Sequence, residues 1–371
     1  MTPMGYSIPF SGTRRDRMKI CVIMLARKFG GAERFYVDLT NGLARRGHHV
    51  LAISHARSKA AQHLDKLPNV SREAIQVLGP WDPLAPRKIL KLVRVFAPDI
   101  IQTSLSRAAH LAGPAAQQLK IPLVAHTHDF VDLKYFRHAD VFTPTTAAQR
   151  DYLLSEGIPI GGVRWIPNFS SLSPVTAIHR RDKVTTIVAL GRFVHKKGFD
   201  MLLRSFNRLA DDNIRLYLAG DGAERQRLMN LAATLNLDNK VHFAGWQDDI
   251  RSFLLQGDLF VLPSRYEPFG IAVLEAMACG LPIIATKCHG PVEILDNDSA
   301  WLCDADEDAL TGALNTAISD PDGRRQRAQA AWTSFRERYA ADTVIPRFES
   351  LYQSICRRHT LKKDSGASVG A

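Results

Sequence analysis

The chain has 371 residues, which exceeds the roughly 250–300 residues at which a single hydrophobic core stops growing and therefore favours two domains. Its composition is ordinary for a soluble α/β protein, and no run reaches the roughly 18 apolar residues that span a bilayer. Residues 1–170 carry 23 Lys and Arg against 12 Asp and Glu, whereas residues 171–371 carry 25 of each, so the net charge of +11 lies in the first half. A basic half favours an anionic partner, such as a phospholipid surface, a phosphorylated glycan or nucleic acid, over a basic surface without a specific partner.

The N-terminal stretch RRDRMKICVIMLARK resembles a signal peptide, because basic residues precede apolar ones. Its apolar core is only about seven residues long, the lower limit for such a signal, and the FGGAER that follows is typical of a glycine turn into a helix. We therefore predict a disordered extension over residues 1–17 and a first strand over residues 19–25. The five cysteines are odd in number and lack CxxC spacing, which predicts reduced thiols in the cytoplasm.

Short β-branched runs alternate with helical patterns along the whole chain. They are KICVIML, HVLAIS, DIIQTS, PLVAHT and DVFTP in the first half, and TTIVAL, IRLYLAG, VHFAG, LFVLP, PIIAT and AWLC in the second. This alternation predicts an α/β fold with parallel sheets and helices on both faces. A stretch rich in Pro, Ser and charge then divides the chain into a domain over residues 18–170, a linker over 171–183 and a second domain over 184–340, and the polar tail over 358–371 is predicted to be disordered.

Gly30 and Gly31 follow the first predicted strand. They allow a tight turn, and the next helix points its N-terminal N–H groups at that turn, which is an arrangement that binds anions. No third glycine arrives in register for the GxGxxG pattern, which weighs against a dinucleotide oxidoreductase. A plain strand-to-helix turn is the alternative interpretation.

The stretch GRFVHKKGFD, residues 191–200, repeats this arrangement in the second half. Arg192 offers a planar fork of donors and Lys197 a point charge, and together they can hold two phosphates. Surface cations paired with Asp200, Asp211 or Asp212 are the alternative. The position at the carboxyl end of a strand, where α/β sheets bind ligands, favours the phosphate interpretation.

The stretch EPFGIAVLE places Glu267 on a loop and Glu275 about one turn into a helix. Backbone N–H groups of residues 269–272 would be unpaired at the helix start. Carboxylates accept hydrogen bonds from vicinal hydroxyl groups, so the pair suits a sugar and a ribose, while the N–H groups suit phosphate. An acid/base pair for hydrolysis, or a capping acid with an exposed helix acid, are the alternatives.

The stretch AHTHDF places His126 and His128 on one face at the end of a first-domain strand. Either could be a structural histidine, and a metal pair without a further ligand is a weak alternative. His128 lies further out along the strand, so we favour it as an active-site group.

The stretch RKILKLVRVF, residues 87–96, is basic and amphipathic. We predict that Ile89, Leu92 and Phe96 pack on the sheet of their own domain. The Arg and Lys face stays outside, where it could contact a membrane surface.

These stretches together, in this order, resemble the retaining GT-B glycosyltransferases of family 4. The resemblance covers residues 18–355 and rests on Gly30–Gly31, HTHD, IPNF, GRFVHKKG, GDGAERQRL and above all SRYEPFGIAVLEAMACGLPIIAT. It implies two Rossmann-like domains whose parallel sheets face a central cleft, with residues 341–357 crossing back onto the first domain. It also implies hexose transfer from a nucleotide-diphosphate sugar to a cell-envelope glycan, such as lipopolysaccharide core or a lipid-linked acceptor.

The resemblance also assigns roles to the candidate residues. Arg192 and Lys197 would hold the diphosphate and stabilise it as the leaving group, while Glu267 would bind the sugar hydroxyls and Glu275 the ribose. His128 would contact the sugar from the first domain. Donor contacts would also come from backbone groups, at Gly30, Gly31, Pro268, Phe269, Gly270, Ile271 and Ala272. Cations and helix N-termini neutralise a departing diphosphate by themselves, so we expect neither a metal nor another cofactor.

Two further hypotheses stay open at this point. Another nucleotide-sugar enzyme of the same architecture, an epimerase or a glucan synthase, fits the same stretches. A basic nucleic-acid-binding protein would show aromatic residues interleaved with Lys and Arg, and no such series stands out. We therefore expect a cytoplasmic transferase, at the inner face of the cytoplasmic membrane if its basic first domain contacts lipid, with no nucleic-acid partner.

Overall fold

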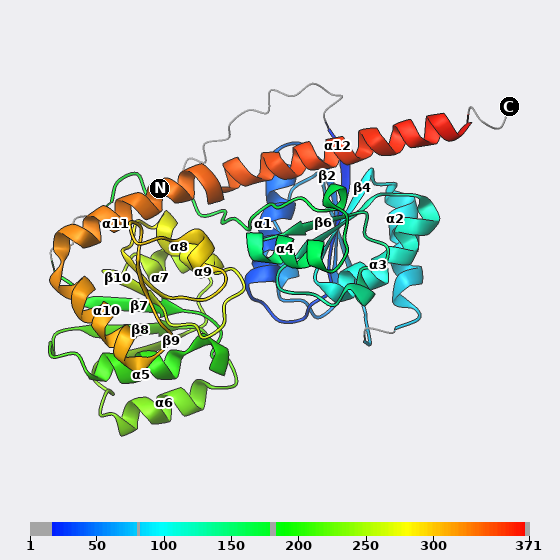
Figure 1. Cartoon of the computed structure of the whole chain (residues 1–371). Helices are drawn as coiled ribbons and strands as arrows, with labels where there is room; N and C mark the ends of the chain where they lie inside the picture. The colour runs from blue at the N-terminus through cyan, green and yellow to red at the C-terminus, as the bar shows by residue number, and fades with distance from the viewer. Residues whose placement is uncertain (1–16, 80–81, 179–182, 368–371) are drawn as a thin grey trace. The chain divides into compact units, whose positions relative to one another are not determined.

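The computed structural model describes residues 17–79, 82–178 and 183–367, and the chain divides into two compact units (Figure 1). The first unit contains Met1–Thr143, Gly157–Arg164 and Ile345–Ala371, and the second contains Pro144–Glu156 and Trp165–Val344. Apart from Arg17, the extension predicted over residues 1–17 lies outside the described residues.

The first unit holds a six-stranded sheet with the strand order β3-β2-β1-β4-β5-β6. Its strands are β1 (Lys19–Met24), β2 (His49–His55), β3 (Val70–Ile75), β4 (Ile100–Ser104), β5 (Leu123–Thr127) and β6 (Val141–Pro144). The five strands predicted for this half are confirmed, because their apolar runs are buried on both faces, as a parallel sheet requires. The prediction missed β3, an edge strand whose sequence VSREAI is largely exposed and carries no such run.

Helices cover both faces of this sheet (Figure 1). They are α1 (Gly31–Arg45), α2 (Ala85–Phe96) and α3 (Ser106–Leu119), with α1 on one face and the mutually packed α2 and α3 on the other. Helix α2 buries Ala85, Ile89 and Val93, four residues apart, on one stripe. The packing predicted for Ile89 is confirmed, whereas Leu92 and Phe96 are only half-buried because they flank this stripe.

The long C-terminal helix α12 (Ala341–Ala367) belongs to the first unit from Ile345 onward. Tyr352 Oη donates to Gln102 Oε1 at 2.9 Å, and the carboxylate of Glu349 accepts from Arg46 Nε at 2.7 Å and His48 Nε2 at 2.8 Å. Burial alone would raise the pKa of Glu349, but the bonds from His48 and Arg46 hold it below its usual value. These buried polar contacts fasten α12 to the first unit.

The tail predicted to be disordered from residue 358 is helical as far as Ala367. Extending a helix that is already packed fixes only one residue per hydrogen bond, and Arg, Leu and Lys in this segment are good helix formers. The remaining residues, 368–371, lie outside the described part of the chain.

The second unit repeats the same strand order, written β12-β11-β10-β7-β8-β9. Its strands are β7 (Thr186–Leu190), β8 (Arg215–Ala219), β9 (Val241–Gly245), β10 (Leu259–Leu262), β11 (Ile283–Thr286) and β12 (Trp301–Cys303). All six correspond to predicted strands. The core between sheet and helices contains Phe193, Phe206, Leu216 and Leu218.

The helices of the second unit are short except at its end. They are α4 (Ala147–Ser155), α5 (Phe199–Asn207), α6 (Arg225–Thr234), α7 (Ile250–Leu254), α8 (Ile271–Ala278), α9 (Pro291–Ile294), α10 (Glu307–Ser319) and α11 (Pro321–Ser334). Helix α4 is held here because the carboxylate of Glu293 accepts from the N–H groups of Ala147, at 2.6 Å, and Ala148, at 2.9 Å. Two of the four N–H groups that a helix start leaves unpaired are thereby satisfied.

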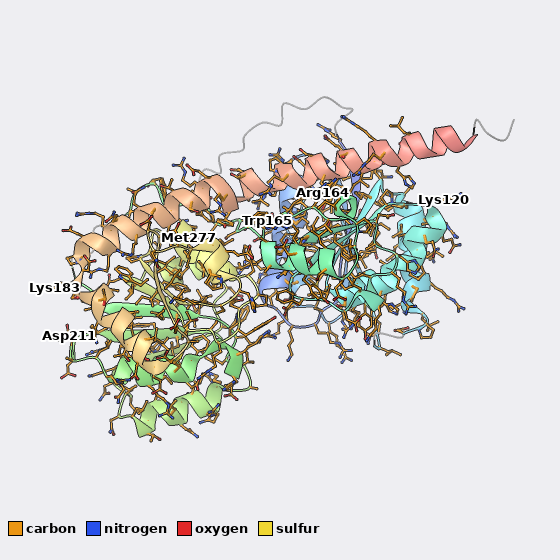
Figure 2. All side chains as sticks on the ribbon, in the orientation of Figure 1. Lys120, Arg164, Trp165, Lys183, Asp211 and Met277 are labelled. Atoms are coloured by element: carbon orange, nitrogen blue, oxygen red, sulfur yellow. The ribbon has the colours of Figure 1, made fainter. Side chains whose placement is uncertain are left out.

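The chain passes between the units at residues 143–144, 156–157, 164–165 and 344–345, and Arg164 and Trp165 on either side of one crossing are labelled in Figure 2. The linker predicted over residues 171–183 contains none of these crossing points. Its described part packs with the second unit. There Val175 N–H donates to Ala278 C=O at 2.9 Å, and Trp332 Nε1 donates to Val175 C=O at 3.1 Å.

Among the described residues, no helix combines the length and the apolar character that crossing a membrane requires. All five cysteines are free, and three of them, Cys21, Cys279 and Cys303, are buried. Burial raises the pKa of the Cys279 and Cys303 thiols to about 11 each. These cysteines therefore pack as small apolar side chains.

Candidate active site

The order of strands in each unit fixes where a ligand can bind. In the second unit, β7 and β10 are neighbours although they are far apart in sequence, and the connections after them run to opposite sides. Ligands of such sheets bind in the crevice at the carboxyl ends of these two strands. The stretches GRFVHKKG and SRYEPFG are the loops that leave β7 and β10.

These two loops contact each other directly. The N–H groups of Arg265, at 2.9 Å, and Tyr266, at 3.1 Å, both donate to the carbonyl oxygen of Lys196. Lys196 Nζ also lies over the Tyr266 ring, 5.1 Å from its centroid, which is close enough for a cation–π contact. The backbone of one loop thus sets the position of the other.

Lys197 and Glu267, one from each loop, form an ion pair. Their side chains are 18% and 10% exposed, so the pair is largely desolvated yet reachable at this edge of the sheet. The ammonium group has three donors and the carboxylate about four acceptor positions, so both keep capacity for a ligand. Two residues singled out from separate stretches of sequence therefore meet at one point.

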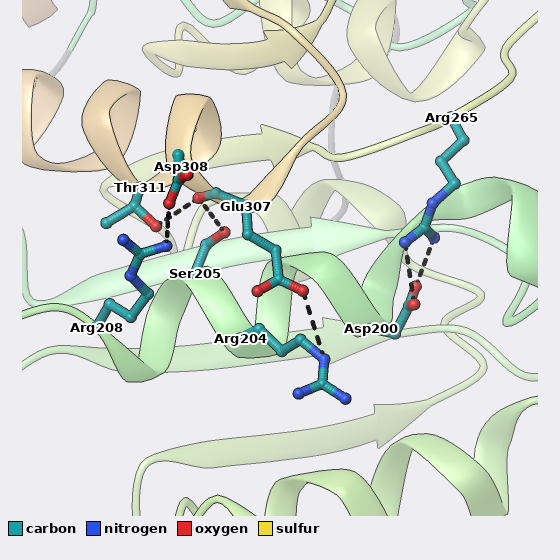
Figure 3. A network of polar contacts seen from close by, with 8 residues as sticks. All are labelled: Asp200, Arg204, Ser205, Arg208, Arg265, Glu307, Asp308 and Thr311. Atoms are coloured by element: carbon teal, nitrogen blue, oxygen red, sulfur yellow. Dashed lines mark hydrogen bonds and ion pairs between the residues drawn. The ribbon is translucent and has the colours of Figure 1, made fainter.

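The loop after β10 also makes a second ion pair, between Arg265 and Asp200 (Figure 3). Arg265 binds the carboxylate of Asp200 through two bonds, of 2.6 and 3.0 Å, which joins the loop after β10 to the first turn of α5. Burial alone would raise the pKa of Asp200, but the bonds and charge of Arg265 keep it below its usual value. Arg204 and Arg208 continue this network to Glu307 and Asp308 at the start of α10 (Figure 3).

Gly198 allows the two loops to approach. Its φ of +67° lies in the left-handed region, and a Cβ at this position would stand 1.9 Å from the carbonyl oxygen of Pro263. No residue with a side chain fits here without moving the backbone. Gly198 therefore fixes the close approach that brings Lys197 to Glu267.

Arg192 follows β7 and is exposed, with no ion pair among the described residues. The acids proposed as alternative partners are engaged elsewhere: Asp200 pairs with Arg265, and Asp212 with Lys240. The carboxylate of Asp211 accepts from Asn213. The described part of the chain thus leaves the Arg192 guanidinium available to a ligand.

Helix α8 begins at Ile271, and its N-cap is Gly270, with φ of +106° and no side-chain cap. The first turn therefore contains Ile271 and Ala272, whereas Phe269, predicted at the helix start, lies in the loop before it. The Val273 N–H donates to the carbonyl oxygen of Gly270. The backbone N–H groups open to a ligand are therefore those of the residues before Val273.

The other predicted residues of this stretch flank the start of α8. Glu275 lies in the second turn of the helix and is buried. The Pro268 carbonyl oxygen accepts from the side-chain amide of Gln149, on α4, at 3.4 Å.

Asp304 and Asp306, a pair of carboxylates just after β12, both make structural contacts. Asp306 caps α10 by accepting from the Ala309 N–H at 2.8 Å, and Asp304 pairs with Lys287 at 3.1 Å. Among the described residues, no group of three or more His, Cys, Asp or Glu side chains gathers at one point where it could hold a metal ion.

In the first unit, the corresponding edge is built on β1, its neighbour β4, and β5 beyond β4. Gly30 is the N-cap of α1 and Gly31 its first residue, directly after the turn that leaves β1, and no side chain caps this helix start. The backbone of Gly30 is extended, with a φ of −165°. The two glycines therefore lie at the carboxyl edge of the sheet, as predicted from their place after the first strand.

His126 and His128, at the end of β5, both pack against Phe35 of α1, with ring centroids 3.9 and 5.2 Å away. The two histidines thus share one face, as the alternation predicted. His126 is fully buried and its Nδ1 lies 2.9 Å from Thr143 Oγ1, which makes it a structural residue.

His128 differs from its neighbour in its hydrogen bonding. Its Nε2 is buried without a partner among the described residues. Burial, and then the nearby His126, hold the pKa of His128 well below its usual value, so the ring is neutral at pH 7. An unsatisfied ring nitrogen at this edge is what a ligand-binding histidine leaves open.

Sequence reasoning missed a basic cluster at the same edge. Arg27 Nε lies 3.2 Å from Nε2 of His55, at the end of β2, and the charges of Arg57 and Arg107 also act on this ring. Burial of the ring lowers the pKa of His55, and these cations lower it further. Each arginine follows β1 or β2 or lies in the first turn of α3, so the signal available in the sequence was basic residues directly after strands.

Comparison with known proteins agrees with this geometry. A family model described as "Glycosyl transferases group 1" matches residues 176–333, and one described as "Glycosyltransferase Family 4" matches residues 29–173. The chain is 30% identical over 335 residues to the lipopolysaccharide core biosynthesis glycosyltransferase LpsE of Rhizobium meliloti, covering 88% of this chain and 97% of that protein. The chain therefore belongs to the family 4 glycosyltransferases with a group 1 domain.

Within that family, the relatives include two enzymes of one pathway. LpsD of the same organism, also a lipopolysaccharide core biosynthesis glycosyltransferase, is 28% identical over 334 residues, covering 87% of this chain and 95% of its own. The protein is thus a glycosyltransferase related to enzymes of lipopolysaccharide core biosynthesis.

Solved structures show the same GT-B fold. HepE of Anabaena, in complex with UDP-glucose, has a TM-score of 0.78 at 22% identity and covers 91% of this chain and 100% of its own. The lipopolysaccharide outer core galactosyltransferase WaaB has a TM-score of 0.71 at 19% identity, covering 91% and 99%. The predicted fold class is confirmed.

Proposed function

We propose that this glycosyltransferase moves a hexose-type sugar from a nucleotide-diphosphate sugar to a cell-envelope glycan, such as lipopolysaccharide core or a lipid-linked glycan. The observation that carries the proposal is the Lys197–Glu267 pair at the carboxyl ends of β7 and β10, where Lys197 shares its loop with Arg192, which has no ion pair among the described residues. The names of LpsE and LpsD support the acceptor class, and the UDP-glucose bound to HepE supports the donor class.

The roles of the residues follow from their chemistry. Arg192 and Lys197 neutralise the diphosphate, and Glu267, through acceptor positions that Lys197 leaves open, accepts from sugar hydroxyl groups. Glu275 binds the ribose hydroxyl groups. The remaining donor contacts come from Gly30, Gly31 and the backbone of residues 268–272.

We propose retention of configuration without a metal ion or another cofactor. The acceptor hydroxyl attacks the anomeric carbon from the face that the diphosphate leaves; the bond from that carbon to the phosphate oxygen breaks as the new glycosidic bond forms. The hydroxyl proton passes to the departing phosphate oxygen. Fixed cations stabilise the charge that grows on that oxygen, and His128, whose Nε2 has no partner within the described ranges, contacts the transferred sugar.

The acceptor is anionic in this proposal. Arg27, Arg57 and Arg107 place positive charge at the edge of the first unit, where His128 and the Gly30–Gly31 turn also lie. Guanidinium groups bind phosphate and carboxylate through two parallel bonds. Part of the basic excess of the first half thus lies at this edge.

Peripheral contact with the inner face of the cytoplasmic membrane is a second part of the proposal. Four cations project from α2, and the apolar side chains of Leu84 and Val95 beside them are 51% and 81% exposed. The four cations are Arg87, Lys88, Lys91 and Arg94.

Anionic vesicles are expected to carry the protein upward in a flotation gradient at low ionic strength and to release it at about 0.5 M salt, because salt screens surface charge. Neutral vesicles are the control. Protein that stays at the bottom with anionic vesicles at low salt contradicts membrane contact.

The transferase proposal is tested with purified protein, a panel of nucleotide-sugars and lipopolysaccharide core acceptors. One donor is expected to give a glycosylated product whose anomeric configuration, measured by NMR, equals that of the donor. An epimerised donor without acceptor would point to the epimerase alternative, and a polymer of the donor sugar to a glucan synthase. Inversion at the anomeric carbon would contradict retention. A nucleic-acid-binding role is not proposed, since the family identifies a transferase.

A further inference from the structure

Two adjoining pockets of the first unit lie away from the edge described above. They share Arg137 and His138 and have volumes of about 200 and 450 Å³. The larger one is lined by residues that precede β5 and β6, namely Lys120, Ile121 and the segment 137–140, together with His359 of α12. It therefore opens at the amino ends of these strands, opposite the carboxyl edge that holds His128.

The larger pocket gathers four side chains that can carry positive charge. Lys120 (Figure 2), Arg137, His138 and His359 line it, and none has a hydrogen-bonded or ion-paired side chain among the described residues. The Nε2 atom of His359 is moreover buried without a partner. Lys120 and Arg137, the two permanent cations, thus keep their donors available to a ligand within the described part of the chain.

Two acids lie beside the cluster, and the carboxylates of both accept hydrogen bonds from the backbone. In the larger pocket, Asp140 accepts from the Leu123 N–H at 2.8 Å. In the smaller pocket, the Asp82 carboxylate accepts from backbone N–H groups of three residues, at 2.8, 2.8 and 3.2 Å. The pKa of His110, which also lines the smaller pocket, is lowered first by burial and then by the charges of Arg137 and His138. In the larger pocket, the two permanent cations, Lys120 and Arg137, therefore outnumber the one carboxylate, Asp140.

The backbone holds part of this cluster in place. A Cβ at Gly113 of α3 would stand 2.5 Å from Cδ2 of His138, so the ring lies directly on the helix. Lys120 ends α3 in a left-handed conformation, with φ of +51°. His138 is thus fixed before any ligand arrives, which reduces the entropy cost of binding.

We propose that the larger pocket binds a phosphate group, as a second site separate from the transfer site. The Arg137 fork and the Lys120 ammonium pair with the phosphate oxygens, and His138 and His359 donate to them from the wall of the pocket. A soluble phosphate monoester and the headgroup of an anionic phospholipid present the same chemistry. The proposal does not depend on the donor assignment, because it rests on residues at the other edge of the sheet.

The full chain is titrated calorimetrically with inorganic phosphate at constant ionic strength, with chloride as the reference. Wild type is expected to bind phosphate, and Arg137→Gln and His359→Gln each to bind it about tenfold more weakly, since each loses a hydrogen bond to the phosphate. Arg72→Gln is the matched control, because Arg72 is an exposed cation of β3, at the other end of the sheet. UDP binding is expected to be equal in all four proteins, which also confirms that each is folded.

Absence of phosphate binding in wild type, equal binding in Arg137→Gln and Arg72→Gln, or displacement of phosphate by UDP would each overturn the proposal. Two further arms identify the source of the phosphate. Binding of glycerol 3-phosphate with no Arg137-dependent binding to phosphatidic acid vesicles assigns a soluble ligand. Vesicle binding that weakens in Arg137→Gln but not in Arg72→Gln assigns a lipid headgroup.

Discussion

Replacement of Lys197 by alanine is expected to lower the rate of sugar transfer by about 10²–10³-fold. The ammonium group lies at the carboxyl edge of β7, where the proposed diphosphate departs, and it is 18% exposed, so little solvent screens its charge. Its loss also leaves the buried carboxylate of Glu267 without its cation. Initial rates with the donor identified in the panel, together with calorimetric binding of UDP, measure the effect.

The neighbouring lysine provides the matched control. Lys196 lies over the Tyr266 ring rather than against Glu267, so Lys196→Ala is expected to lose less than about tenfold in rate. Equal losses in both variants, or unchanged UDP binding in Lys197→Ala, would remove the assignment of Lys197 to the diphosphate. Circular dichroism melting curves of both variants separate a loss of chemistry from a loss of folding.

Gly198→Ala is expected to lower the free energy of unfolding by about 2–5 kcal/mol, the sum of a left-handed backbone cost and a displaced loop. The new methyl group would stand 1.9 Å from the Pro263 carbonyl oxygen, so the loops after β7 and β10 must separate. Transfer by the protein that remains folded is expected to fall about 10²-fold, because a shift of about 1 Å in a positioned group costs that much. Thermal unfolding and the transfer assay measure the two effects.

Gly312→Ala on α10 is the control for this substitution. A Cβ at Gly312 meets nothing within 4 Å, and the position is helical, so alanine is expected to stabilise the protein by about 0.5–1 kcal/mol. Transfer should be unchanged. A Gly198→Ala variant with the stability and activity of Gly312→Ala would show that the close approach at Pro263 does not position Lys197.

Much of the fold was readable from the sequence because parallel strands, buried on both faces, need uninterrupted apolar runs. All six strands of the second unit and five of the first carry such runs. The edge strand β3 does not, since one edge and much of its surface face solvent, and no period distinguishes VSREAI from a loop. The end of α12 escaped prediction for a related reason, since it is polar and its helical state depends on packing further up the helix.

The sequence predicts those residues of the site that lie directly after a strand. Lys197 and Glu267 were found separately, each after an apolar run, but their contact depends on the strand order that makes β7 and β10 neighbours. The support from Arg265 to Asp200 and the arginines around His55 depend on loop paths in space. Local sequence carries no information on such paths, which is why these residues were missed.

The route of α12 has a consequence for biogenesis. Phe348 and Tyr352 fill the core of the first unit, where Phe348 packs against Phe35, with ring centroids 5.7 Å apart. A nascent polypeptide leaves the ribosome from its N-terminus, at roughly 5–20 residues per second. The lobe that emerges first must therefore wait for the last helix to be translated, whereas the other lobe is complete once Val344 has emerged. The unit that is synthesised first is therefore the unit that completes its folding last.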